Sequence, residues 1–114
     1  MRYGMNPHQS AWIVAGHGPR VINGKPSMIN YLDALNGLQL VREADEATGR
    51  PAAASFKHVS PAGAALAGVV DATAALIWRA GGVEGASLLS AYIRARDADP
   101  RSSFGERRRA FAAS

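Results

Sequence analysis

The sequence predicts a small α/β layered fold. A helical pattern begins at Ile29 and is closed by Gly49 and Pro51. Its apolar positions recur at roughly helical spacing: Leu32, Leu35, Leu38 and Val41. The short apolar run 52–56 follows at once and is typical of a buried strand. A polar loop and an Ala-rich stretch come next. Helix, buried strand, loop and helix in succession indicate packed α and β layers.

Length and composition limit the class of protein. The chain has 114 residues, of which 47% are hydrophobic and 19% charged, as in one compact globular domain. It has no cysteine, which excludes disulfides, thiolate metal sites and a cysteine nucleophile. No apolar run approaches the ~20 residues of a membrane helix, and no secretion signal opens the chain. We therefore expect a cytoplasmic protein with no membrane contact.

The flanking elements are predicted in the same way. Two β-prone runs, 11–14 and 21–22, surround a Gly/Pro turn and predict a small hairpin within 10–23. The stretch 64–80 is predicted to be helical, with an interruption at Gly68. A further helix over 85–98 ends before Pro100 and is followed by a loop over 102–105. The apolar face of that helix is predicted to be Leu88, Leu89, Tyr92 and Ile93.

The formal net charge of +4 is concentrated near the C-terminus. The arginines of that end are Arg94, Arg96, Arg101 and Arg107 to Arg109. A basic end can attract nucleic acid or a phosphorylated ligand. Aromatic residues do not alternate with these arginines as they do in single-strand binders. We therefore favour a solvated Arg-rich tail over a nucleic-acid interface.

The pair Lys57-His58 follows the predicted buried strand and has the residue types of a catalytic pair. A histidine can take a proton from an amine nucleophile, and an adjacent ammonium can stabilise negative charge on oxygen. The alternative is a capping or packing pair before a helix that starts near Pro61. Residue types alone do not separate these two interpretations.

Two further polar clusters lie near the ends of the chain. Arg2 and Tyr3 are suited to a phosphate, because a guanidinium fork makes two charge-assisted hydrogen bonds and a tyrosine adds a hydroxyl donor. Taken alone, they fit a frayed terminus better than a phosphate site. The other cluster is the segment 102–105, which reads Ser-Ser-Phe-Gly.

These clusters belong to a series of longer motifs. In order, the chain carries RYGMNPHQ at 2–9, IN at 29–30, DALN at 33–36, SFKHVSPAGAA at 55–65, AYIRAR at 91–96 and SSFG at 102–105. Together they resemble the transformylase part of the bifunctional phosphoribosylaminoimidazolecarboxamide (AICAR) formyltransferase/IMP cyclohydrolase family. The matches run from residue 2 to about residue 105, with a divergent stretch between 66 and 86.

The resemblance implies a fold, a reaction and partners. The fold would be cytidine-deaminase-like, without the zinc, and this chain would hold part of it as one subdomain. The reaction would transfer a formyl group from 10-formyltetrahydrofolate to the 5-amino group of AICAR in purine biosynthesis. The implied partners are AICAR and the folate cosubstrate, with no metal, and the implied assembly is a homodimer.

The resemblance also assigns roles to residues. His58 would relay the amine proton and Lys57 would polarise the formyl oxygen. The substrate-binding residues would be Arg2 and Tyr3 at the phosphoribosyl end, Asn30 in the same pocket, and Phe104 and Gly105 beside the heterocycle. His8 is a further candidate.

The chain departs from the family at both ends. Residues 1–105 would form a partial transformylase domain, and 106–114 an Arg/Ala-rich tail in place of the family's apolar strand. The family's cyclohydrolase domain would precede Arg2, and its second deaminase-like half would follow Gly105. We therefore expect a fragment without cyclohydrolase activity that carries one wall of the transformylase site. The alternative is a non-catalytic nucleotide-binding remnant of the family.

Overall fold

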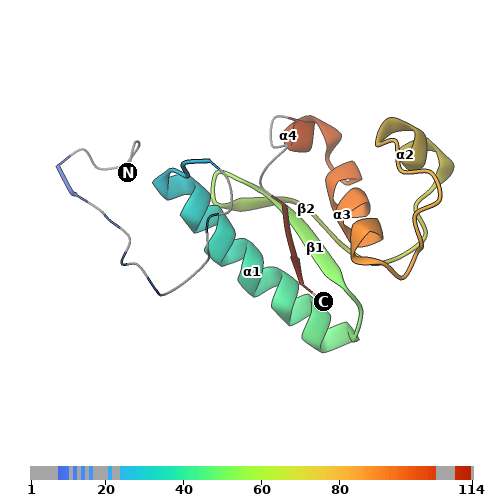
Figure 1. The fold of residues 1–114 in the computed structure, drawn as a ribbon, viewed down its shortest axis with the longest axis horizontal. Helices are drawn as coiled ribbons and strands as arrows, with labels where there is room; N and C mark the ends of the chain where they lie inside the picture. Colours follow the sequence, from blue (N-terminus) through green and yellow to red (C-terminus); the bar gives the residue numbers. More distant parts are fainter. Residues whose placement is uncertain are drawn as a thin grey trace.

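A three-stranded antiparallel sheet separates two helical layers (Figure 1). The structure is a computed structural model and describes residues 8–10, 12, 14, 16, 21, 24–104 and 110–113. Its elements are α1 (Met28–Thr48), β1 (Ala52–Lys57), β2 (Ser60–Leu66), α2 (Ala72–Ile77), α3 (Leu88–Asp97), α4 (Pro100–Phe104) and β3 (Ala110–Ala113). The strand order is β2-β1-β3, so β1 lies at the centre.

Helix α1 confirms the predicted first helix. Ser27 precedes its first turn as the N-cap residue. At the other end Gly49 adopts a left-handed φ of 62° and donates its N–H to the carbonyl oxygen of Asp45 at 2.7 Å. Val41 is buried, whereas Leu35 of the predicted apolar face is 48% exposed. The buried face instead runs through the positions 33, 37 and 41.

Strand β1 confirms the predicted buried strand and joins the two halves of the core. Its first five residues are all buried. Successive side chains of a strand point to opposite faces. On one face, Ala52, Ala54 and Phe56 pack with Val41 of α1. On the other face, Ala53 packs with Ala91 and Ala95 of α3.

The predicted helix over 64–80 is wrong for most of its length. Strand β2 runs antiparallel to β1, and only Ala72–Ile77 is helical. Alanine favours a helix by intrinsic propensity, but pairing with β1 and packing against α3 override that preference here. Pro61 is tolerated because β2 is an edge strand with an irregular register beside it.

Helix α3 confirms the helix predicted over 85–98, but its buried face differs from the prediction. Ile93 is buried, whereas Leu89 is 53% exposed. The other buried positions of α3 are Ser90, Ala91, Ala95 and Arg96. Small residues face the sheet because α3 lies very close to β2. A Cβ built on Gly63 would be 2.1 Å from the carbonyl oxygen of Ala95.

The C-terminal part also differs from the prediction. Residues 100–104 form α4, so most of the segment predicted as a loop is helical. Within the predicted Arg/Ala-rich tail, residues Ala110–Ala113 form β3, which pairs antiparallel with β1. The hairpin predicted within 10–23 is largely outside the described residues, and those described there (residues 10, 12, 14, 16 and 21) are not in strands.

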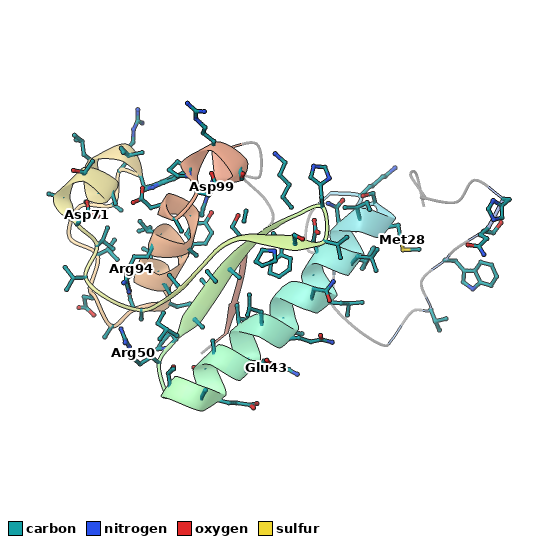
Figure 2. All side chains as sticks on the ribbon, turned by 180° about the vertical axis from the view of Figure 1, so that it is seen from behind. Met28, Glu43, Arg50, Asp71, Arg94 and Asp99 are labelled. Carbon is teal, nitrogen blue, oxygen red and sulfur yellow. The ribbon has the colours of Figure 1, made fainter. Side chains whose placement is uncertain are left out.

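Arg94 and Arg96 of the basic end contact other parts of the fold, so the prediction of a solvated Arg-rich tail is wrong for these two residues. Arg94 donates from Nη1 to the carbonyl oxygen of Leu66 at 2.6 Å. Arg50 donates to the neighbouring carbonyl of Ala67, so both guanidinium groups meet the end of β2 (Figure 2). Arg96 is only 8% exposed. None of the helices in the described ranges is long and apolar enough to cross a membrane.

Candidate functional site

Lys57 and His58 lie at the tip of the β1–β2 hairpin. Lys57 is the last residue of β1 and pairs with Ser60, so the connection consists of His58 and Val59 alone. These two residues have φ values of 53° and 63°. Positive φ at both positions of a two-residue connection identifies a type I′ turn, which matches the twist of the flanking strands. The polar pair is therefore on a tight turn and not before a helix.

The turn is fastened to α1 by a buried carboxylate. The backbone N–H of Val59 donates to Oδ1 of Asp33 at 2.7 Å. Asp33 is completely buried in the first half of α1. A β-branched residue at positive φ is strained, so this turn requires support from its surroundings. Asp33 supplies that support and fixes the hairpin tip relative to α1.

Asn30 lies one helical turn before Asp33 on the same helix. Its Oδ1 accepts hydrogen bonds from the backbone N–H of Ser27 at 2.8 Å and from the Ser27 hydroxyl at 2.9 Å. This contact satisfies donors at the start of α1. The side-chain oxygen of Asn30 thus has a structural task at the start of α1. The structure brings Asn30 to the same end of α1 as the hairpin tip.

A second carboxylate lies on the other side of the hairpin. By the alternation along β1, Lys57 points to the face covered by α3 and α4. Asp99 precedes α4 and accepts a hydrogen bond from the backbone N–H of Ser102 at 3.0 Å. Hydrogen bonds from Ser102 lower the pKa of Asp99, and the positive charge of Lys57 lowers that pKa further. Figure 2 shows the hairpin tip between Asp99 and the Met28 end of α1.

The structure describes only some of the other predicted site residues. Phe104 ends α4, a helix that contacts β1 and β2. His8 is exposed. Arg2, Tyr3 and Gly105 lie outside the described residues. The structure therefore brings Lys57, His58 and Asn30 to one end of the sheet, with α4 beside them. A cleft shared with Arg2 and Tyr3 remains a prediction.

The hairpin tip places a base, His58, next to a cation, Lys57, which suits proton transfer beside a developing negative charge. The His58 side chain is exposed at the tip and carried on a backbone held from α1. The adjacent Lys57 is half-buried and near a carboxylate. The backbone positions of this base and this cation are set relative to each other by the turn. Catalysis by positioned groups requires such a supporting backbone.

Sequence reasoning missed Asp33 and Asp99 as parts of the site. A signal existed for Asp33, because it shares the four-residue spacing of Gly37 and Val41, the buried face of α1. An acidic residue on a buried helix face needs a hydrogen-bonding partner. For Asp99 the signal was weaker: an aspartate directly before Pro100 is typical of a helix N-terminus.

Comparisons with known proteins give the following relatives. The family model described as AICARFT/IMPCHase bienzyme matches residues 1–107. The bifunctional purine biosynthesis protein PurH of Magnetococcus marinus is 36% identical over 115 aligned residues, covering 92% of this chain and 18% of that protein. The protein of the same name from Aquifex aeolicus is 34% identical over 113 residues, with the same two coverages. This chain spans 18% of the length of each relative.

Proposed function

Because the chain belongs to the AICARFT/IMPCHase bienzyme family, we propose that its β1–β2 hairpin carries the catalytic pair of a formyl transfer to AICAR. This membership confirms the resemblance predicted from the motifs. The observation that carries the proposal is the type I′ turn that holds His58 beside Lys57 and is fastened through Asp33. The formyl donor would be 10-formyltetrahydrofolate.

His58 and Lys57 would have complementary roles. The 5-amino nitrogen of AICAR attacks the formyl carbon, a new N–C bond forms, and the bond from that carbon to N10 of the folate breaks. His58 takes the proton that the amine loses and, as the imidazolium, gives it to the leaving N10. The Lys57 ammonium stabilises the negative charge that develops on the formyl oxygen.

The substrate contacts follow from the family pattern. Arg2 and Tyr3 would bind the phosphoribosyl end, and the amide NH₂ of Asn30 would face the same pocket. The heterocycle would lie beside Phe104 and Gly105. The position of Asn30 on the end of α1 that meets the hairpin supports this arrangement. His8 is a further candidate contact.

The finer fold and assembly are also proposals. A sheet with helices on both faces supports a cytidine-deaminase-like subdomain, which in this family would need no zinc. Family resemblance further favours a homodimer in the cytoplasm. A second candidate function is a nucleotide-binding module without turnover, because the candidate residues in the described part of the chain gather at one place, the hairpin tip and the first turn of α1.

Calorimetric titration of the whole chain with AICAR tests the binding part of the proposal. Loss of a charge-assisted phosphate contact costs about 1.5–3 kcal/mol, so Arg2→Ala should weaken binding at least about tenfold. The matched control is Arg42→Ala, an exposed arginine of α1. Equal affinity of wild type and Arg2→Ala would remove Arg2 from the site.

A folate-dependent turnover assay separates the two functions. Holding donor and acceptor at reacting distance supplies about 7–11 kcal/mol of a barrier reduction, and the proposed site residues of this chain would form one wall of the site. We therefore expect little or no turnover from the chain alone. AICAR binding without turnover favours the binding module, whereas turnover lost in His58→Ala favours a minimal transformylase. Turnover that is unchanged in His58→Ala would contradict the proposed role of the hairpin.

A further inference from the structure

A cavity of about 390 Å³ lies between α3 and the loop that follows α2, away from the hairpin. Figure 1 shows α2 at the opposite end of the molecule from the first turn of α1. The residues that matter for its chemistry are Trp78, Arg79, Leu89, Tyr92, Ile93 and Arg96. This volume falls in the range of small-molecule sites. Nothing in the proposed formyl transfer uses this cavity.

The wall of the cavity contains a buried cation held by two aromatic rings. Arg96 is 8% exposed, and its guanidinium carbon lies 4.6 Å from the centre of the Trp78 ring and 5.5 Å from that of Tyr92. Its Nη1 donates to the Tyr92 hydroxyl at 2.8 Å. Rings occupy the faces of a guanidinium, whereas its N–H donors point outward in its plane. A guanidinium held in this way has a fixed position in the wall of the cavity.

The second cation comes from the loop after α2. Arg79 is exposed and has a φ of 53°, an unusual conformation for a residue other than glycine. Trp78, before it, is fixed because its indole N–H donates to Oδ1 of Asp97 at 2.9 Å. Asp97 itself is not among the described residues that line the cavity. Among the described residues that line the cavity there are two arginines and no acidic residue.

We propose that this cavity binds an organic anion, a carboxylate or phosphate group carried on an apolar body. The two arginines supply the charge that such an anion needs, and Arg96 is already ordered by its rings. The apolar side chains of Leu89 and Ile93 line the remaining wall and suit the body of the ligand. Polar groups placed at few points of a mainly apolar hollow are typical of ligand sites.

The chain carries its own internal control for a binding experiment. Its two tryptophans give two indole N–H signals in a ¹H–¹⁵N spectrum. Trp78 lines the cavity, and Trp12 is 77% exposed elsewhere. The probes are phenyl phosphate and benzoate, with benzyl alcohol as the neutral analogue and inorganic phosphate as the anion without a body. We expect both organic anions to shift the Trp78 signal saturably and to leave Trp12 in place.

Variants connect the shift to the two cations. Arg96→Met should weaken binding about tenfold or more, because it removes a charge-assisted contact. Arg79→Ala should weaken it about threefold, the size expected of an exposed charge. Arg101→Ala should bind as the wild type does, because Arg101 is an exposed arginine of α4 that does not line the cavity. If Arg96→Met does not fold, Arg79→Ala alone tests whether the cations of the cavity contribute to binding.

Several results would overturn the proposal. Equal binding of benzyl alcohol would show an apolar hollow with no preference for charge. Equal binding of inorganic phosphate would show that the apolar wall has no role. Shifts of both tryptophans together would indicate non-specific association, and a lack of saturation up to the solubility limit would indicate no site. Affinity unchanged in Arg79→Ala and Arg96→Met would remove both cations from the site.

Discussion

Replacing Asp33 by alanine tests whether the hairpin is held from α1. The substitution removes the carboxylate that accepts the Val59 N–H at 2.7 Å. Asp33 has no exposed surface, so water does not readily take the place of the lost acceptor. Glu43→Ala is the matched control, since Glu43 is an exposed acid of the same helix.

The magnitude follows from the kind of contact. A hydrogen bond to a charged group contributes about 1.5–3 kcal/mol, and a buried donor left without its partner adds to the loss. We expect Asp33→Ala to lower the free energy of unfolding by about 2–3 kcal/mol. Asp33→Asn keeps an acceptor oxygen and should cost about 1 kcal/mol. Glu43→Ala should stay within about 0.5 kcal/mol of the wild type.

Urea denaturation measures the stability, and amide hydrogen exchange reports on the turn itself. The Val59 N–H should lose protection in Asp33→Ala more than the amides of α3 do. Unchanged Val59 protection, or a stability loss no larger than that of Glu43→Ala, would refute the argument that Asp33 fixes the turn. A rescue variant adds a second check. Val59→Gly in the Asp33→Ala background should recover stability, because glycine adopts positive φ without strain.

Three further predictions follow from the same structure. Gly63→Ala should cost about 1–3 kcal/mol or more in urea denaturation, because its Cβ would lie 2.1 Å from a backbone oxygen of α3, while Gly81→Ala, which meets no atom within 4 Å, is the control. The pKa of Asp99 is lowered in the fold by Ser102, so its stabilisation is present above the unfolded pKa near 3.8 and is lost as the pH falls through the folded value. Denaturation of Asp99→Asn should therefore show a weaker loss of stability than the wild type between about pH 5 and pH 2. His58→Asn should raise stability by up to about 1 kcal/mol, measured in urea, because asparagine tolerates the left-handed conformation better than histidine.

The elements that were predicted correctly are those whose pattern is decided locally. Helix α1 has a helical period and a glycine at its C-terminus, and β1 is a short apolar run after a proline. The strand β2 could not be identified in this way. Its sequence shows no alternation of apolar and polar residues. Gly63 allows α3 to lie close to β2, but this role is visible only once the position of α3 is known. The helix propensity of alanine therefore led to the wrong prediction of a helix in this segment.

The turn at the tip escaped prediction for a related reason. Type I′ turns are typically indicated by pairs such as Asn-Gly or Asp-Gly, and the pair His58-Val59 is not of this kind. The chemistry of the pair Lys57-His58 was visible in the residue types, but its position was not. Asp33 lies 26 residues before Val59, so the contact that fixes the turn exists only in the folded chain.

The choice of residues in this turn is itself informative. Histidine and valine at positive φ cost about 1–3 kcal/mol each, and the fold offsets this cost with a buried carboxylate. A turn needed only to connect two strands would be more stable with asparagine and glycine. If His58 were a surface residue without a task, His58→Asn would stabilise the chain and change nothing else. If the imidazole takes the amine proton, the same substitution stabilises the fold and abolishes any formyl transfer, because an amide side chain is no base at neutral pH. Opposite changes in stability and turnover are the expected mark of a strained functional turn.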